Sequence, residues 1–208
     1  MSYLYLDTSE YLIVGVCDSD YRWLDYQMLK EKKSASKIHQ LINGVLQKLK
    51  LEFSQLEAVF HAAGPGSYTG IRLSEGITQI LELEKYQIYS FYHFEIPKLL
   101  GEASGSWVST AFRDEFFVYS WFGDEKTSKL LGRSDFINFV NNNEHKIYGH
   151  GDSPAISELN LNKDIDETSK LIEKQADQIF PQVAKLKLRR EPFYYRQLEQ
   201  EFLPSLKD

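Results

Sequence analysis

The residues best suited to hold a phosphate group lie in one glycine-rich turn, Gly64–Arg72, with the sequence GPGSYTGIR. An apolar run, Glu57–Ala63, precedes the turn and is typical of a buried strand, and apolar residues at helical spacing follow over Ile71–Leu83. In such a turn, backbone N–H groups and the positive end of a helix dipole point toward the same place, so the turn can hold an anion there. The Gly-Lys-Ser/Thr ending of a phosphate loop is missing, and the glycines are spaced one residue too far apart for a dinucleotide fingerprint. Local chemistry therefore leaves an anion site and a simple connection both open.

Residues within this turn have distinct predicted roles. Pro65 fixes its own φ and keeps Gly64 out of the helical region. Gly66 can adopt a positive φ or allow another backbone to approach closely. Thr69 is the predicted N-cap of the following helix. The candidate anion-proximal residues are Gly64, Pro65, Gly66, Ser67, Thr69, Gly70 and Arg72.

A second candidate ligand for phosphate or metal is Asp7. It lies between two apolar runs, Tyr3–Leu6 and Tyr11–Cys17, which predict a strand hairpin with Thr8 and Ser9 in its polar connection. The connection contains no glycine, so a turn or capping role for Asp7 is favoured over metal-phosphate ligation.

A hydrolase of the peptidase kind would need a nucleophile, a base and an orienting group. Ser67 is a conceivable nucleophile, and His39, His61 and His93 are conceivable bases, but nothing in their spacing selects them. No second histidine lies four residues from His93, and one histidine cannot hold a catalytic metal without other ligands. The sequence therefore predicts no catalytic residue and no metal site.

The composition is that of an ordinary globular protein that folds unaided. The 208 residues are 42% hydrophobic and 26% charged, with a net charge of −6, which argues against tight nucleic-acid binding by this chain alone. Cys17 is the single cysteine, so a disulfide framework is excluded and a reducing compartment is favoured. No apolar run approaches 18 residues, so we expect a cytoplasmic protein without a membrane span.

The remaining pattern predicts two similar halves. Ser34–Lys50 is the clearest amphipathic helix, capped by Ser34 or Ser36. A small Gly/Ser-containing stretch, 101–105, predicts a boundary between residues 1–103 and 104–208. The basic run Leu186–Arg190 is interpreted as a solvated helix end. The other predicted elements are strands at Tyr21–Leu29, Tyr86–Phe91 and Lys146–Gly149, a hairpin of Trp107–Phe112 with Glu115–Phe122, and helices at Ile96–Leu100, Ser134–Val140, Thr168–Phe180 and from Pro181.

Four segments in order along the chain resemble the bacterial TsaB family, also called YeaZ. The most specific is Gly64–Arg72, which is similar to the family's signature string. The weaker three are Leu4–Ser9 (LYLDTS), Ala111–Tyr119 (AFRDEFFVY) and Pro192–Arg196 (PFYYR). Together they span almost the whole chain.

The resemblance implies an α/β actin-like ATPase fold (ASKHA, RNase H-like), with a reduced C-terminal lobe. It also implies a non-catalytic partner of the catalytic subunit TsaD and the ATPase TsaE in forming N6-threonylcarbamoyladenosine in tRNA. In nucleotide-binding members of the fold, a glycine-rich first hairpin holds phosphate; here Asp7, Thr8 and Ser9 form a degenerate version of it.

On this reading the chain binds no cofactor strongly, ATP and Mg²⁺ belong to the partner subunits, and tRNA is contacted only through the complex. The family builds a helical bundle with TsaD from its first two helices, and a homodimer of the same face is a further expectation. The alternative is a small actin-fold ATPase or kinase, or a peptidase-like enzyme, that uses Gly64–Gly70. The residues expected at the partner interface are Ile38, His39, Ile42, Leu46, Glu75 and Gln79.

Overall fold

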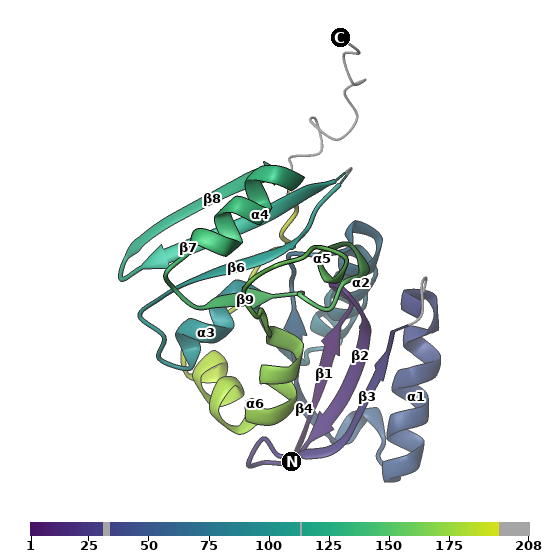
Figure 1. The fold of residues 1–208 in the computed structure, drawn as a ribbon. Helices are drawn as coiled ribbons and strands as arrows, with labels where there is room; N and C mark the ends of the chain where they lie inside the picture. The colour runs from purple at the N-terminus through teal and green to yellow at the C-terminus, as the bar shows by residue number, and fades with distance from the viewer. Residues whose placement is uncertain (31–33, 113, 196–208) are drawn as a thin grey trace.

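The computed structural model describes residues 1–30, 34–112 and 114–195. In this part of the chain the strands form two five-stranded sheets, with helices packed against both (Figure 1). The predicted strands and helices are found within a few residues of their expected ends. Two strands of the second sheet, Glu125–Gly132 and Asp166–Glu167, were not predicted.

The first sheet has the strand order β3-β2-β1-β4-β5. Strand β1 pairs antiparallel with β2 and parallel with β4. At the two edges of the sheet, β3 pairs antiparallel with β2 and β5 pairs parallel with β4. Strands β1, β2 and β4 are almost wholly buried, as expected for apolar strands covered on both faces. The strands are β1 (Ser2–Asp7), β2 (Leu12–Cys17), β3 (Trp23–Leu29), β4 (Leu56–Ala62) and β5 (Gln87–Phe91).

The second sheet repeats this topology. Its order is β10-β9-β6-β7-β8, in which β6 pairs antiparallel with β7 and parallel with β9. The repeat confirms the predicted actin-like fold, and the very short β9 and β10 agree with a reduced second lobe. Most residues of β8 are exposed and polar or charged, so this strand lacked the apolar pattern that predicts a strand. The strands are β6 (Ser104–Thr110), β7 (Glu115–Phe122), β8 (Glu125–Gly132), β9 (Ile147–Gly149) and β10 (Asp166–Glu167).

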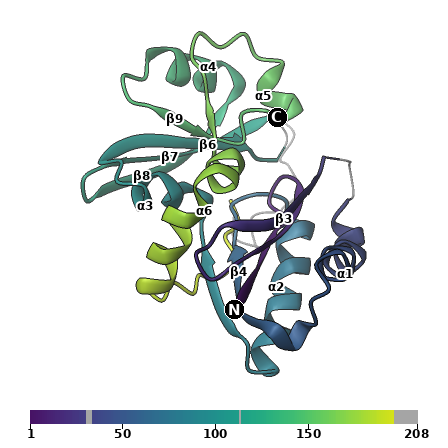
Figure 2. The ribbon, with the colours of Figure 1, turned by 90° about the horizontal axis from the view of Figure 1, so that it is seen from below.

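Helices cover both faces of the first sheet. Helices α1 (Ile38–Leu49) and α2 (Tyr68–Leu83) pack on one face and lie next to each other (Figure 2). Helix α6 (Thr168–Lys185) covers the other face, where Phe180 stacks on Phe60 with ring centroids 4.4 Å apart. The remaining helices are α3 (Ile96–Leu99), α4 (Arg133–Asn142) and α5 (Pro154–Ser157), with 3₁₀ turns η1 (Ser34–Lys37), η2 (Phe53–Gln55) and η3 (His93–Glu95).

Two helix predictions need correction. We expected one helix to end at Phe180 and another to begin at Pro181, but α6 runs to Lys185 and includes Pro181. The break lies earlier, at Gln175, whose φ is −135°. The N-cap of α1 is Lys37, without a side-chain cap bond, in place of the predicted serine.

The division at residue 103 stays a prediction, although β6 begins at Ser104. The chain passes to the second sheet there and then returns, because α6 packs on the first sheet. Helix α4 instead covers the second sheet, where its Phe136 stacks on Phe116.

Candidate functional site

The glycine-rich turn is packed against the β1–β2 connection. A Cβ on Gly66 would meet the Ser9 carbonyl oxygen, and one on Gly70 would meet that of Thr8, so both glycines are required by close backbone approach. The Ser67 amide donates to the Ser9 carbonyl at 2.6 Å. The N-cap of α2 is Ser67, whose hydroxyl accepts from the Gly70 amide, and not the predicted Thr69, which is exposed.

Asp7 is buried and its carboxylate is engaged by hydrogen-bond donors. One oxygen, Oδ1, accepts from the Ser9 amide at 2.8 Å, and Oδ2 lies 3.0 Å from His93 Nε2 and 3.1 Å from the Tyr5 hydroxyl. Burial alone would raise the pKa of this carboxyl, but His93 and the Ser9 amide outweigh it and hold the pKa well below its usual range. The hydrogen bond from the Ser9 amide lies within the β1–β2 connection, which is the contact that a turn role for Asp7 predicts.

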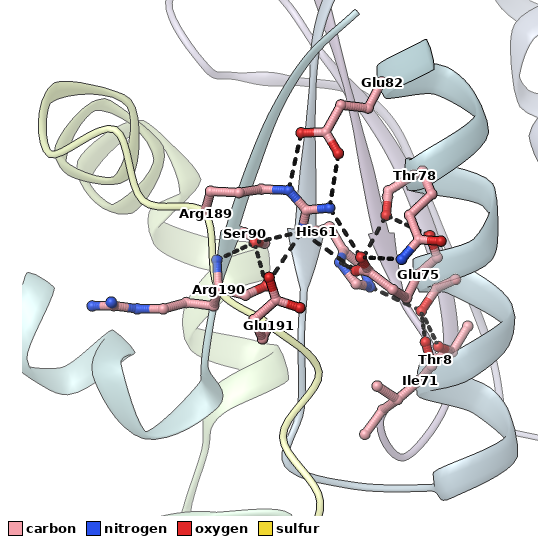
Figure 3. Close-up of polar contacts among 12 residues, drawn as sticks. Thr8, His61, Ile71, Glu75, Thr78, Glu82, Ser90, Arg189, Arg190 and Glu191 are labelled. Carbon is pink, nitrogen blue, oxygen red and sulfur yellow. Dashed lines mark hydrogen bonds and ion pairs between the residues drawn. The ribbon is translucent and has the colours of Figure 1, made fainter.

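Thr8 begins a buried polar network that reaches helix α2 (Figure 3). Its hydroxyl donates to Ser74 Oγ at 2.8 Å, and Ser74 Oγ lies 2.9 Å from His61 Nε2. The other ring nitrogen of His61, Nδ1, is 3.6 Å from Glu75 Oε2. Burial lowers the pKa of His61 to about 4, so its ring is neutral at pH 7.

Ser74, His61 and Glu75 thus have the residue types of a hydrolase triad, but they are 0%, 0% and 5% exposed. A substrate carbonyl cannot reach a fully buried serine, so this arrangement stabilises the contact between β4 and α2. Ser67, the conceivable nucleophile, lies elsewhere, at the N-cap of α2. Of the three conceivable bases, His61 belongs to this buried network, His93 contacts Asp7 and His39 is exposed on α1.

A cleft of about 370 Å³ opens between the two lobes. The first lobe contributes Ser9, Glu10 and Gly66–Tyr68, the second contributes Thr110–Phe112, and Tyr194 and Tyr195 come from the tail that follows α6. Arg72 lies 4.2 Å from the ring of Tyr68 and 5.9 Å from that of Tyr194. The signature turn therefore lies where the two lobes meet.

Three acidic residues, Glu10, Asp152 and Glu167, lie at or near the turn that follows β9. Asp152 accepts from Lys30 Nζ at 2.7 Å and from the Tyr11 hydroxyl at 2.8 Å. Burial and the charge of Asp152 raise the pKa of Glu10 to about 7 and that of Glu167 to about 8. Among the described residues no group of three or more His, Cys, Asp or Glu side chains could hold a metal ion.

The predicted interface residues fall on different sides of their helices. Ile38, Ile42 and Leu46 pack against the first sheet and are at most 4% exposed, so we correct their assignment from partner contacts to core. Glu75 is also buried and faces inward, whereas His39 and Gln79 are exposed. A helix that packs on a sheet buries its most apolar side against that sheet. The most apolar positions of the helix therefore predict its core contacts and not its contacts with a partner.

The outward side of α2 carries a different set of residues, which we call the outer stripe: Gly76, Gln79, Ile80 and Leu83. Ile80 is 61% exposed and Leu83 is 81% exposed. A Cβ on Gly76 would meet no atom of the described residues within 4 Å, and the same holds for Gly44 on the neighbouring helix α1. Glycine is unfavourable inside a helix, and no contact among the described residues requires it at either position.

The basic run Leu186–Arg190 is not a solvated helix end. Arg189 Nη2 lies 2.9 Å from Glu75 Oε1 and 3.2 Å from Glu82 Oε2, both on α2 (Figure 3). Arg190 makes a second ion pair, 2.6 Å from Glu95 Oε1. Short-range charge patterns could not predict these contacts, because each arginine pairs with residues about 95 to 114 positions away.

Comparison with known proteins establishes the fold that this chain shares. No protein-family model and no curated protein matches the sequence. Among solved structures, YeaZ from Pseudomonas aeruginosa is 18% identical with a TM-score of 0.50, covering 72% of this chain and 75% of its own. An uncharacterized Pseudomonas aeruginosa protein with similarity to peptidase YeaZ is 16% identical with a TM-score of 0.58, covering 94% of this chain and 99% of its own. The predicted likeness to YeaZ proteins is thus confirmed at the level of the fold.

No helix among the described residues has the length and apolar character needed to span a bilayer.

Proposed function

We propose that this chain is a TsaB-type, non-catalytic scaffold and activator subunit. It pairs with TsaD, in a complex that includes the ATPase TsaE, for N6-threonylcarbamoyladenosine formation in tRNA. TsaD supplies the chemistry, the partner subunits hold ATP and Mg²⁺, and tRNA is contacted through the complex. The YeaZ-like fold and the four matching sequence segments support this proposal.

The observation that carries the proposal is the outer stripe of α2. Two large apolar side chains, Ile80 and Leu83, are exposed on a helix that begins at the signature turn. Beside them Gly76, and on the adjacent helix Gly44, leave open surface where another helix could approach closely. Exposed apolar groups with small residues between them favour a protein partner over open solvent.

The state of the phosphate hairpin also favours a scaffold over an ATPase. The Asp7 carboxylate is buried beneath three donors, and Gly66 and Gly70 are packed against the backbone of Thr8 and Ser9. A phosphate between the two loops would have to displace these contacts. This packing therefore supports a scaffold over an ATPase that holds phosphate between the two loops.

Co-purification with the cognate TsaD, with and without ATP, tests the pairing. We expect a stable complex, and we expect Ile80→Glu to disrupt it because a charge would be buried in an apolar interface. Leu186→Glu is the matched control, since Leu186 is also an exposed apolar residue of similar size (58% exposed) but lies at the C-cap of α6 and not on α2. Equal loss in both variants, or no complex with the unmodified chain, would refute the proposal.

The same surface supports weak self-association when TsaD is absent. We expect sedimentation velocity to detect a homodimer at high concentration that Ile80→Glu abolishes and that TsaD displaces. A strict monomer at every concentration would contradict this part of the proposal.

A further inference from the structure

The segment that follows α6 crosses from the first lobe to the second. We call residues 188–195 the strap. We propose that the strap is a brace that fixes the two lobes against each other and forms one wall of the cleft, with Arg189 as its anchor. This inference is independent of the proposed function.

The first half of the strap is fixed to the first lobe by charge-assisted and backbone hydrogen bonds. Arg189 donates to Glu75 and Glu82 on α2 and, at 3.2 Å, to Ser90 Oγ on β5. The Leu188 carbonyl accepts from the Ser90 amide at 2.9 Å, so the strap also follows the edge strand of the sheet. Since Glu75 is 5% exposed, the arginine neutralises a carboxylate that is nearly removed from solvent.

The middle of the strap contacts the signature turn. The Phe193 amide donates to the Ala63 carbonyl at 2.9 Å, and a Cβ on Gly64 would lie 3.1 Å from the Phe193 carbonyl oxygen. Tyr92 donates to the Glu191 carbonyl at 2.9 Å. The strap therefore passes directly over the point where β4 leads into the glycine-rich turn.

The last residues of the strap pack on the second lobe. The Tyr195 hydroxyl is 2.6 Å from Ser109 Oγ on β6, and the rings of Phe193 and Tyr195 lie 5.5 Å and 5.1 Å from that of Phe117 on β7. Tyr194 and Tyr195 also line the cleft. One short segment thus touches both sheets, and separation of the lobes would require it to leave one of them.

Hydrogen exchange measures release of the strap from the first lobe. In Arg189→Gln we expect the Ser90 and Phe193 amides to lose protection by roughly tenfold to hundredfold, the range that corresponds to loss of a charge-assisted hydrogen bond. Amides in the centre of β1 should keep their protection from hydrogen exchange. Lys185→Gln is the matched control, because it removes one positive charge from an exposed position just before the strap.

Two further variants separate release of the strap from general instability. Glu75→Gln combined with Arg189→Gln removes both charges of this ion pair, so Glu75 is not left as a buried carboxylate without its arginine, and the double variant should release the strap as Arg189→Gln does. Tyr195→Phe deletes only the hydroxyl that bonds to Ser109 at the opposite end, and it should loosen the attachment to the second lobe.

Movement of the lobes is measured by the distance between two spin labels. The labels are attached to cysteines introduced at Gln47 on α1 and Lys126 on β8, both of which are exposed. Cys17→Ser removes the native cysteine, so that only these two positions carry a thiol. We expect the distance distribution to broaden and shift to longer values in the Arg189→Gln and Tyr195→Phe variants, but not in Lys185→Gln. Unchanged amide protection in Arg189→Gln would overturn the proposal. So would loss of protection with an unchanged distance distribution, because a strap that can leave without movement of the lobes is not a brace.

Discussion

The same substitution at two glycines should have opposite effects on stability. A Cβ on Gly66 would lie 2.6 Å from the carbonyl carbon and 2.7 Å from the Cα of Ser9. These are backbone atoms, and the Ser67 amide holds them in place by its hydrogen bond to the Ser9 carbonyl. Gly66→Ala should therefore destabilise the fold by about 1–3 kcal/mol, the usual effect of overpacking.

Gly76→Ala should instead stabilise the isolated chain. The added methyl group meets nothing within 4 Å in the described part of the chain, and alanine is favoured over glycine inside a helix by about 0.8–1 kcal/mol. If a partner helix packs closely on the outer stripe, the same methyl group should weaken pairing with TsaD. At an exposed position outside a partner interface, Gly→Ala would raise the stability of the chain without lowering its affinity for TsaD.

Urea denaturation at pH 7 with constant m-values provides the two free energies of unfolding. For a chain of this size each kcal/mol corresponds to roughly 2–4 °C in Tm, so thermal unfolding gives an independent check. A neutral Gly66→Ala variant, or a Gly76→Ala variant that is less stable than the unmodified chain, would refute the account of the turn and of the outer stripe.

Two other residues give distinct predictions. Asp7→Asn should lower the free energy of unfolding by about 1–3 kcal/mol at pH 7, because it removes a buried acceptor shared by His93 and Tyr5; urea denaturation measures it. The same variant should leave ATP turnover with Mg²⁺ at the background of the unmodified chain, whereas activity that disappears with Asp7 would support an enzyme. Burial and Asp152 raise the pKa of Glu167 from 4.5 to about 8, so the stability it contributes is complete below about pH 4.5 and is lost as the pH rises through about 8. Glu167→Gln should therefore raise Tm more at pH 9 than at pH 5, and an equal shift at both values would contradict the assigned titration.

Most of the fold could be predicted because its signals are local. The helical spacing of α1 and α2, the apolar runs of β1, β2 and β4, and the GPGSYTGIR string all depend on neighbouring residues. The missed strand β8 shows the limit of this approach. Its charged, exposed residues pair with β7 through the backbone, and that pairing leaves no hydrophobic pattern in the sequence.

The site was predicted less completely because it depends on contacts between distant segments. The sequence pointed to Asp7 and the glycine-rich turn, yet nothing near His93 indicates that it bonds to Asp7, 86 residues earlier. The direction of an amphipathic helix was also ambiguous. Its apolar edge proved to be the buried one, so the exposed Ile80 and Leu83 were missed as candidate partner contacts.

The most direct test of the central proposal is the affinity of this chain for its cognate TsaD, measured by isothermal titration calorimetry with the unmodified chain, Leu83→Glu and Leu186→Glu. We predict measurable binding by the unmodified chain, at least about tenfold weaker binding by Leu83→Glu, which corresponds to about 1.4 kcal/mol, and unchanged binding by Leu186→Glu. Leu83→Glu binding as tightly as the unmodified chain would contradict the account.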